Sequence, residues 1–237
     1  MSEWKARRFW KAVSTREAEG GHQVFLDDRA LSTPGKLPLI LPTAALAEAL
    51  AEEWQAQGDL IQPQTMPLTR AANSAIERVS TQFEGVADML AEYGGTDLLS
   101  YRATEPAALI EMQADSWDPL LDWARSDLGV DLKVTQGVIP VAQDPADMAR
   151  LRALLDEFDA FGLTALHDLV TLPGSLILGL AVVRGRLDAE RSFAFSRIDE
   201  EFQAAQWGRD EEADEAAEAR RLSMISAERL WHLSRVG

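Results

Sequence analysis

The sequence predicts an α+β protein, with a small N-terminal antiparallel β domain followed by a larger all-α domain. Three observations lead to this prediction. Short β-prone segments separated by turn residues occupy roughly the first 42 residues. Beyond them, apolar residues recur with helical spacing almost to the C-terminus. The chain has 237 residues, 46% of them apolar, which is enough for one large domain or two small ones.

The N-terminal strands are predicted from composition and from the turns between them. Residues 9–13, 23–26 and 37–41 are short and partly β-prone. Gly20-Gly21 separates the first two segments, and glycine can take the positive backbone angles that a tight hairpin turn requires. We therefore expect a small antiparallel sheet.

One amphipathic helix follows the predicted sheet. Leu46, Leu50 and Trp54 recur at four-residue spacing, which places them on one face of a helix. Thr43 stands at the N-cap position and Gly58 at the C-terminal stop. The spacing predicts a helix between these two residues.

The segment of residues 61–69 contains Pro63 and Pro67, which interrupt helical structure. It is therefore the predicted hinge or domain boundary. We expect a β-rich domain with one helix over residues 1–65 and an all-helical domain over residues 66–237.

Further helices are predicted along the second domain from apolar periodicity and from capping residues. Thr69, Asp144, Ser175 and Asp188 are the predicted N-caps. The expected helices cover residues 69–79, a stretch ending at 93, 109–128 with a kink or break at Pro119, 145–158, 163–169, 175–183, 188–207 and 210–235. Residues 129–141 alternate like a strand and are expected to form a short strand or a loop.

Charge and composition exclude several classes of function. The 39 acidic and 23 basic side chains leave a net charge of -16, which disfavours binding to a phosphate backbone. The chain has no cysteine, so disulfides, thiolate metal sites and cysteine nucleophiles are excluded. No apolar stretch approaches the roughly 20 residues that a membrane helix requires. The basic start of the chain has no apolar core of the kind found in an export signal.

Standard catalytic and cofactor motifs are missing from the sequence. His22, His167 and His232 lie far apart and lack metal-ligand spacing. The glycines do not form a phosphate-binding loop, and no Gly-x-Ser-x-Gly elbow is present. We therefore expect no cofactor, no metal and no catalytic residue.

The acidic stretch after residue 198 is the most distinctive feature of the C-terminal region. Helical spacing places Glu200, Gln203 and Trp207 along one stripe, with Glu201 about a hundred degrees round the helix. A solvated acidic face is the simplest interpretation of such a stretch. Trp207, however, lies beside Gly208 at a helix end where burial is difficult to complete, so it is the strongest candidate contact residue.

An ordered set of segments resembles the assembly chaperones of the ATP synthase alpha subunit over roughly residues 7–233. The segments are RFWKAV, FLDDRALSTP, LPTAALAEALAEEW, MPLTRAANSAIERV, YGGTDLLSYR, QADSWDPLLDWA, PGSLILGLA and EEFQAAQWGRDEEA. The resemblance implies the same β-then-helical architecture. It also implies a protein without turnover, which binds the newly made alpha subunit of F-type ATP synthase and shields the surface that later meets the beta subunit.

The resemblance further implies where the partner binds and where the protein works. The expected partner-binding residues are Glu200, Glu201, Gln203, Trp207, Gly208, Asp210, Glu211 and Glu212. The protein is expected to be a monomer when free, in the cytoplasm of a bacterium or in the mitochondrial matrix if it is a processed eukaryotic form. Two other functions remain open. One is a small hydrolase that uses carboxylates such as Glu200 and Glu201, and the other is an acidic adaptor with no fixed client.

Overall fold

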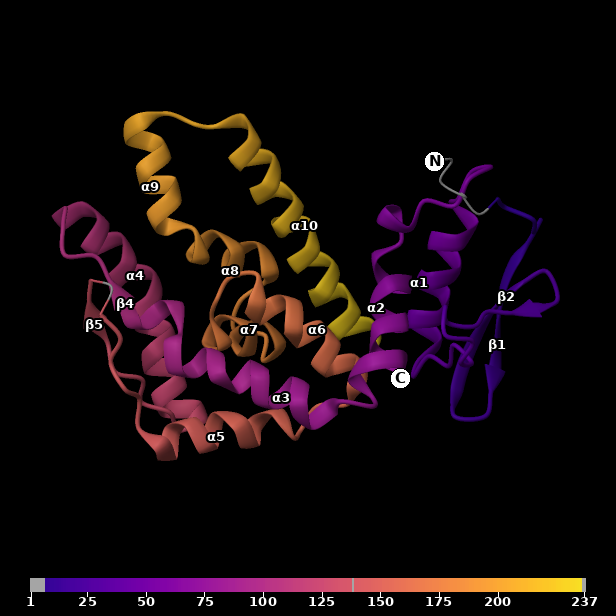
Figure 1. Cartoon of the computed structure of the whole chain (residues 1–237), viewed down its shortest axis with the longest axis horizontal. Helices are drawn as coiled ribbons and strands as arrows, with labels where there is room; N and C mark the ends of the chain where they lie inside the picture. The colour runs from indigo at the N-terminus through magenta and orange to yellow at the C-terminus, as the bar shows by residue number, and fades with distance from the viewer. Residues whose placement is uncertain (1–6, 138, 236–237) are drawn as a thin grey trace. The chain divides into compact units, whose positions relative to one another are not determined.

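A computed structural model describes residues 7–137 and 139–235 (Figure 1). The strands are β1 (Val13–Ala18), β2 (Gly21–Leu26), β3 (Arg29–Ala30), β4 (Tyr101–Arg102) and β5 (Thr135–Gln136). The α-helices are α1 (Ala44–Gln55), α2 (Pro67–Ser74), α3 (Phe83–Glu92), α4 (Ala107–Trp123), α5 (Pro145–Leu155), α6 (Ala160–Thr171), α7 (Leu176–Val183), α8 (Ala189–Ser196), α9 (Ile198–Trp207) and α10 (Glu211–Leu233). The predicted fold class, a small N-terminal antiparallel sheet followed by a mostly helical region, is confirmed.

The N-terminal sheet is an antiparallel meander in the order β1-β2-β3. Gly20 and Gly21 connect β1 to β2 with φ of 85° and 152°, angles that glycine adopts at little cost. The predicted strand at 23–26 lies within β2, whereas the one at 9–13 is wrong in position, because β1 begins only at Val13. The predicted strand at 37–41 forms only isolated bridges, at Pro38 and Leu41. Proline has no N–H to contribute to a strand ladder.

The chain forms two compact units. Within the described residues, the first comprises the chain up to Phe83, Asp159–Ala165 and the residues from Arg229 onward. Its core joins side chains that lie far apart in the sequence, including Leu46, Leu50, Ala165 and Leu230. Leu68 and Ala72 of α2 belong to the same core, so this unit continues past residue 65. The division into domains at residue 65 stays a prediction.

The second unit comprises Glu84–Phe158 and Leu166–Glu228. Its helix α7 is buried along its whole length and packs against α4 and α8. The buried carboxylate of Asp97 accepts hydrogen bonds from Ser175 Oγ at 2.7 Å and from the backbone N–H of Ile177 at 3.0 Å. A carboxylate at this position satisfies the free N–H groups of the first helical turn and complements the helix dipole.

Most predicted caps are confirmed. The side chains of Thr43, Asp144, Ser175 and Asp188 each accept a hydrogen bond from the first turn of the helix that follows. Thr69 is not a cap, because α2 begins at Pro67 and Thr69 lies inside it.

Three other predictions concern the helical region. Helix α4 is continuous through Pro119, so the expected break is absent there. Residues 129–141 contain the short strand β5, which pairs in parallel with β4. The helix predicted over residues 188–207 is divided at Arg197 into α8 and α9.

Candidate partner-binding site

The backbone at Arg197 leaves helical geometry, with φ of -114° and ψ of 16°, and this break sets the direction of α9. Asp199, Glu200 and Glu201 then occupy the first turn of α9. Negative charge at a helix N-terminus is favourable because the peptide dipoles leave partial positive charge there. The acidic run is therefore compatible with a stable helix before any partner binds.

Two hydrogen bonds from α4 hold the end of α8 and the start of α9. The side-chain amide of Gln113, which is buried, donates to Oδ1 of Asp199 at 2.7 Å. The indole Nε1 of Trp117 donates to the backbone carbonyl of Phe195 at 2.9 Å. Asp199 thus has a positioning contact, whereas Glu200, the next residue, is exposed.

Glu201 lies between two arginines. Its carboxylate accepts hydrogen bonds from Arg197 at 3.2 Å and from Arg209 at 2.7 Å, and Arg209 also pairs with Asp214 of α10 at 3.0 Å. Partial burial acts to raise the pKa of Glu201, but the hydrogen bonds from Arg209 and Arg197 outweigh it and leave the pKa below its usual value. Glu201 is therefore held ionised and connects α9 to the start of α10.

The turn from α9 to α10 carries the most exposed aromatic ring in the described part of the chain. Trp207 is 79% exposed at the end of α9, and Gly208 follows it with φ of 98°. Asp210 accepts a hydrogen bond from the N–H of Ala213 at 2.8 Å, so it caps α10. Figure 1 shows this turn between the two helices. We call residues 207–212 the α9–α10 corner.

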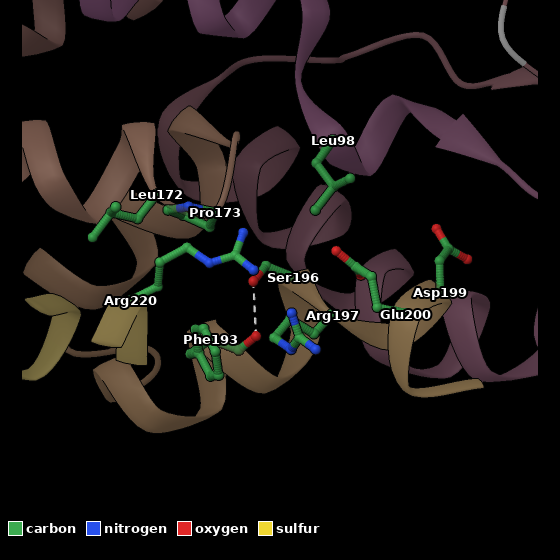
Figure 2. A pocket seen from close by; sticks show the side chains of 9 residues that line it. All are labelled: Leu98, Leu172, Pro173, Phe193, Ser196, Arg197, Asp199, Glu200 and Arg220. Carbon is green, nitrogen blue, oxygen red and sulfur yellow. Dashed lines mark hydrogen bonds between the residues drawn. The ribbon is translucent and has the colours of Figure 1, made fainter. Parts of the chain in front are cut away.

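Two concave regions flank these elements. A cavity of about 310 Å³ is lined by Leu98, Leu172, Pro173, Phe193, Ser196, Arg197, Asp199, Glu200 and Arg220 (Figure 2). A second, more open hollow of about 540 Å³ is lined by Arg209, Glu211, Asp214, Glu215 and Glu218. Both lie within the second unit. Together they offer charged and apolar surface of the kind that receives protein side chains.

The predicted contact residues are brought together only in part. Glu200 lines the cavity and Glu211 lines the second hollow, whereas Trp207 lines neither. Because α9 is continuous, Glu200, Gln203 and Trp207 lie along one side of it, and all three are exposed. Glu212 is also exposed.

Four further side chains at this site were not predicted from the sequence, namely Gln113, Arg197, Arg209 and Arg220. The four-residue spacing of Arg197 and Glu201 is a pattern that could have predicted their ion pair. Gln113 and Arg220 come from helices distant in sequence from α9, so no local pattern could have indicated them.

The paired environment of Glu201 also bears on the carboxylate hydrolase considered above. Two guanidinium groups favour the ionised form of Glu201, which suits ion pairing better than proton donation. The carboxyl group whose pKa is raised to about 6 is that of Asp97, because burial outweighs its hydrogen bonds from Ile177 and Ser175. Asp97 does not line the cavity.

Two further observations concern metal binding and membrane insertion. Across residues 7–137 and 139–235, no group of three or more His, Asp or Glu side chains is arranged to hold a metal ion. In the same part of the chain, no helix combines the length and the apolar character needed to cross a bilayer.

Comparison with known proteins places this architecture in a family. The model of the ATP12 chaperone protein family matches residues 7–125. The crystal structure of Atp12 from Paracoccus denitrificans is 63% identical, with a TM-score of 0.95 over 98% of this chain and 100% of that one. A solved protein of Agrobacterium tumefaciens is 38% identical, with a TM-score of 0.91 over 95% of this chain and 85% of that one. Mitochondrial atp12 of Schizosaccharomyces pombe is 27% identical over 223 residues, which are 88% of this chain and 76% of that protein. This chain therefore belongs to the ATP12 chaperone family, whose members are chaperones of F1 ATP synthase assembly.

Proposed function

We propose that this protein binds the unassembled alpha subunit of F-type ATP synthase, hereafter the client, and shields its beta-facing surface until the catalytic F1 head is built. Membership of the ATP12 family supports the general role. Unassembled subunit surfaces that are apolar associate with one another, and a partner that binds them lowers the concentration of the free form. The role requires binding and release but no chemical turnover.

The exposure of Trp207 is the observation that carries the assignment of the contact surface. A tryptophan that is 79% exposed loses much unfavourable contact with water when a partner covers it. Tryptophan is also among the residues that most often dominate binding energy, because its rigid ring buries a large area. We assign the contact to Trp207 and Gly208 with Gln203, and to the carboxylates of Glu200, Glu201, Asp210, Glu211 and Glu212.

The charge of this region supports the capture of a client with basic groups at its interface. Nine acidic and four basic side chains lie between residues 197 and 221. Such a field accelerates the encounter with a positively charged surface and weakens as salt is added. Arg209 keeps Glu201 and Asp214 in fixed positions, so part of this charge is already oriented before the client arrives.

We further propose that the free protein is a monomer and acts in the compartment where the client is made. The likeness to a Paracoccus denitrificans protein supports the bacterial cytoplasm. A mitochondrial relative supports the matrix for a eukaryotic form. Size-exclusion chromatography with light scattering tests the monomeric state, for which a mass near 26.1 kDa is expected.

The decisive experiment measures capture of the client and suppression of its aggregation. Purified alpha subunit is diluted from denaturant, and light scattering is followed with and without the chaperone. We expect the wild-type protein to suppress scattering and Trp207→Ala to lose at least about tenfold in affinity. Phe9→Ala is the matched control, because Phe9 is also an exposed aromatic residue, at 61%, but lies in the first unit.

Two outcomes would contradict the proposal. Failure of the wild-type protein to bind the alpha subunit would remove the client assignment. Equal capture of unrelated basic proteins, lost at moderate salt and unaffected by Trp207→Ala, would instead indicate an adaptor without a fixed client.

A further inference from the structure

The cavity of about 310 Å³ combines an apolar lining with charges of both signs. Leu98, Leu172, Pro173 and Phe193 supply the apolar surface. Arg197 and Arg220 contribute positive charge, and Asp199 and Glu200 contribute negative charge. Figure 2 shows all of these side chains around the cavity. Its chemistry therefore differs from that of the α9–α10 corner, where acidic residues predominate.

Several polar groups of the cavity already have partners. Arg197 pairs with Glu201 at 3.2 Å, and Asp199 accepts a hydrogen bond from Gln113 at 2.7 Å. The hydroxyl of Ser196 donates to the carbonyl of Phe193 at 2.7 Å, the bond drawn in Figure 2. These contacts satisfy the groups nearest to the start of α9 and hold them in place.

Arg220 and Glu200 are the exceptions. Both are exposed, and neither forms a hydrogen bond or an ion pair with any residue that the structure describes. Figure 2 shows their side chains entering the cavity from different elements, Arg220 from α10 and Glu200 from α9. The cavity therefore presents one unpaired cation and one unpaired anion, carried by separate helices.

The state of Arg220 contrasts with that of its neighbour. Arg221, the next residue on α10, pairs with Glu190 at 2.5 Å and with Glu218 at 2.7 Å. Carboxylates are abundant in a chain with a net charge of -16, and Asp199 and Glu200 line the same cavity, yet Arg220 pairs with none of the carboxylates that the structure describes. An unpaired guanidinium in such a position is available to a carboxylate supplied from outside.

We propose that this cavity binds a client segment in which an apolar side chain lies between a carboxylate and a basic side chain. The carboxylate pairs with Arg220, the basic group pairs with Glu200, and the apolar side chain covers Leu98, Pro173 and Phe193. This inference rests on the proposed function and adds to it the chemical character of the segment. It also specifies the direction in which the segment lies in the cavity, because a segment in the opposite direction would bring like charges together at Arg220 and at Glu200.

The cavity distinguishes the two directions of a bound segment, because its two unpaired charges lie on different helices and cannot exchange places. A reversed segment brings its basic group to Arg220 and its carboxylate to Glu200, and both contacts are repulsive. The cavity thus selects the direction of the bound client segment, while the α9–α10 corner attracts the client.

The test measures the affinity of the full-length chaperone for the isolated alpha subunit, by surface-immobilised binding at low salt. The variants are Arg220→Glu, Glu200→Arg and the double variant that carries both changes. Exposed controls with matched charge changes are Arg186→Glu and Glu111→Arg, which lie in the same unit and line neither concave region. A thermal melt of each variant confirms that it is folded.

We expect each single reversal at Arg220 or Glu200 to weaken binding by about tenfold or more, and each control to change it by less than about twofold. The double variant has the wild-type net charge, so it distinguishes the effect of where the two charges lie from the effect of the net charge. It should bind no better than the weaker single variant, because both contacts are repulsive for a segment that enters in the direction it takes in the wild-type complex.

Wild-type affinity in the double variant would overturn the inference, because binding would then not depend on which helix carries which charge. Unchanged affinity in Arg220→Glu, with the wild-type protein still binding the client, would overturn it while leaving the proposed function intact. No binding by the wild-type protein would overturn both.

Discussion

The side-chain amide of Gln113 bridges the backbone of Ala103 and the carboxylate of Asp199, and its contact with Asp199 positions the start of α9. Its Nε2 donates to Oδ1 of Asp199 at 2.7 Å, while its Oε1 accepts from the N–H of Ala103 at 2.8 Å. Gln113 is 1% exposed, so neither bond competes freely with water. One buried amide therefore connects the middle of α4 to the residue before Glu200.

Gln113→Ala should lower the free energy of unfolding by about 1–3 kcal/mol, because it leaves a backbone N–H and a carboxylate without their partner. It should also weaken capture of the client, since α9 loses a positioning contact. Urea denaturation followed by circular dichroism measures the first effect. Gln136→Ala is the control, because Gln136 is exposed and forms no side-chain hydrogen bond within the described chain. Equal stability of the two variants would contradict the role of Gln113.

Truncation of Trp117 should lower the stability of the protein strongly, whereas truncation of Trp207 should leave it almost unchanged. Trp117 is 1% exposed, and its Nε1 donates to the carbonyl of Phe195 at 2.9 Å. Trp117→Ala should destabilise the protein by about 3–5 kcal/mol through the cavity it leaves. Trp207→Ala should change stability by no more than about 0.5 kcal/mol, because its ring is mostly in water. If Trp117→Ala does not fold, Trp117→Phe provides the comparison, with a smaller loss in the same direction.

Asp97 should make stability fall as the pH rises. Its pKa is raised from 3.8 to about 6 in the folded state, so between these values the unfolded chain releases a proton that the folded chain retains. The contribution of Asp97 is fully present below the unfolded value and is lost as the pH rises through the folded one. The loss amounts to about 3 kcal/mol.

Asp97→Asn isolates this contribution because asparagine does not titrate in that range. Its amide cannot accept all the hydrogen bonds that Ser175, Ile177 and Leu99 donate, so the variant should be less stable than wild type at pH 4. Unfolding in urea at pH 4 and pH 7 should show the difference between the two proteins narrowing at the higher pH. A difference that widens would contradict the raised pKa.

Arg209 should matter more for client capture than for stability. It bridges Glu201 at 2.7 Å and Asp214 at 3.0 Å, but its side chain is largely exposed, so these pairs contribute little to stability. Arg209→Ala makes the α9–α10 corner more acidic and yet should weaken capture, because two carboxylates lose their fixed positions. Arg125→Ala is the matched control, since Arg125 also bridges two carboxylates, Asp122 and Asp131. Stronger capture by Arg209→Ala would mean that net charge outweighs orientation.

Gly179 and Gly85 offer a paired test of packing around helices. A Cβ at Gly179 would lie 2.5 Å from Cγ2 of Val170 and 3.1 Å from the carbonyl oxygen of Leu169. Gly179→Ala should therefore destabilise the protein by about 1–3 kcal/mol. A Cβ at Gly85 meets nothing within 4 Å, so Gly85→Ala in α3 should stabilise it by up to about 1 kcal/mol. Thermal unfolding of both variants should show shifts of opposite sign.

Features that depend on neighbouring residues were predictable from the sequence. Thr43, Asp144, Ser175 and Asp188 cap their helices through hydrogen bonds to N–H groups no more than three residues away. The Gly20-Gly21 turn is equally local, because only the backbone freedom of these two residues is needed. The ordered resemblance along the chain extended the prediction to the family, which the comparisons confirm.

Features that depend on contacts between distant residues came only from the tertiary structure. Arg197 divides a helix that apolar periodicity alone would continue. The buried Asp97 meets Ser175, 78 residues further along the chain, and Gln113 meets Asp199 across 86 residues. The cavity joins Leu98, Glu200 and Arg220 in the same way. The fold class, most helix starts and the acidic segment that carries Trp207 follow from local sequence patterns. Only tertiary packing decided which of those charges are paired and which remain available to a client, because ion pairing depends on distances that no local pattern contains.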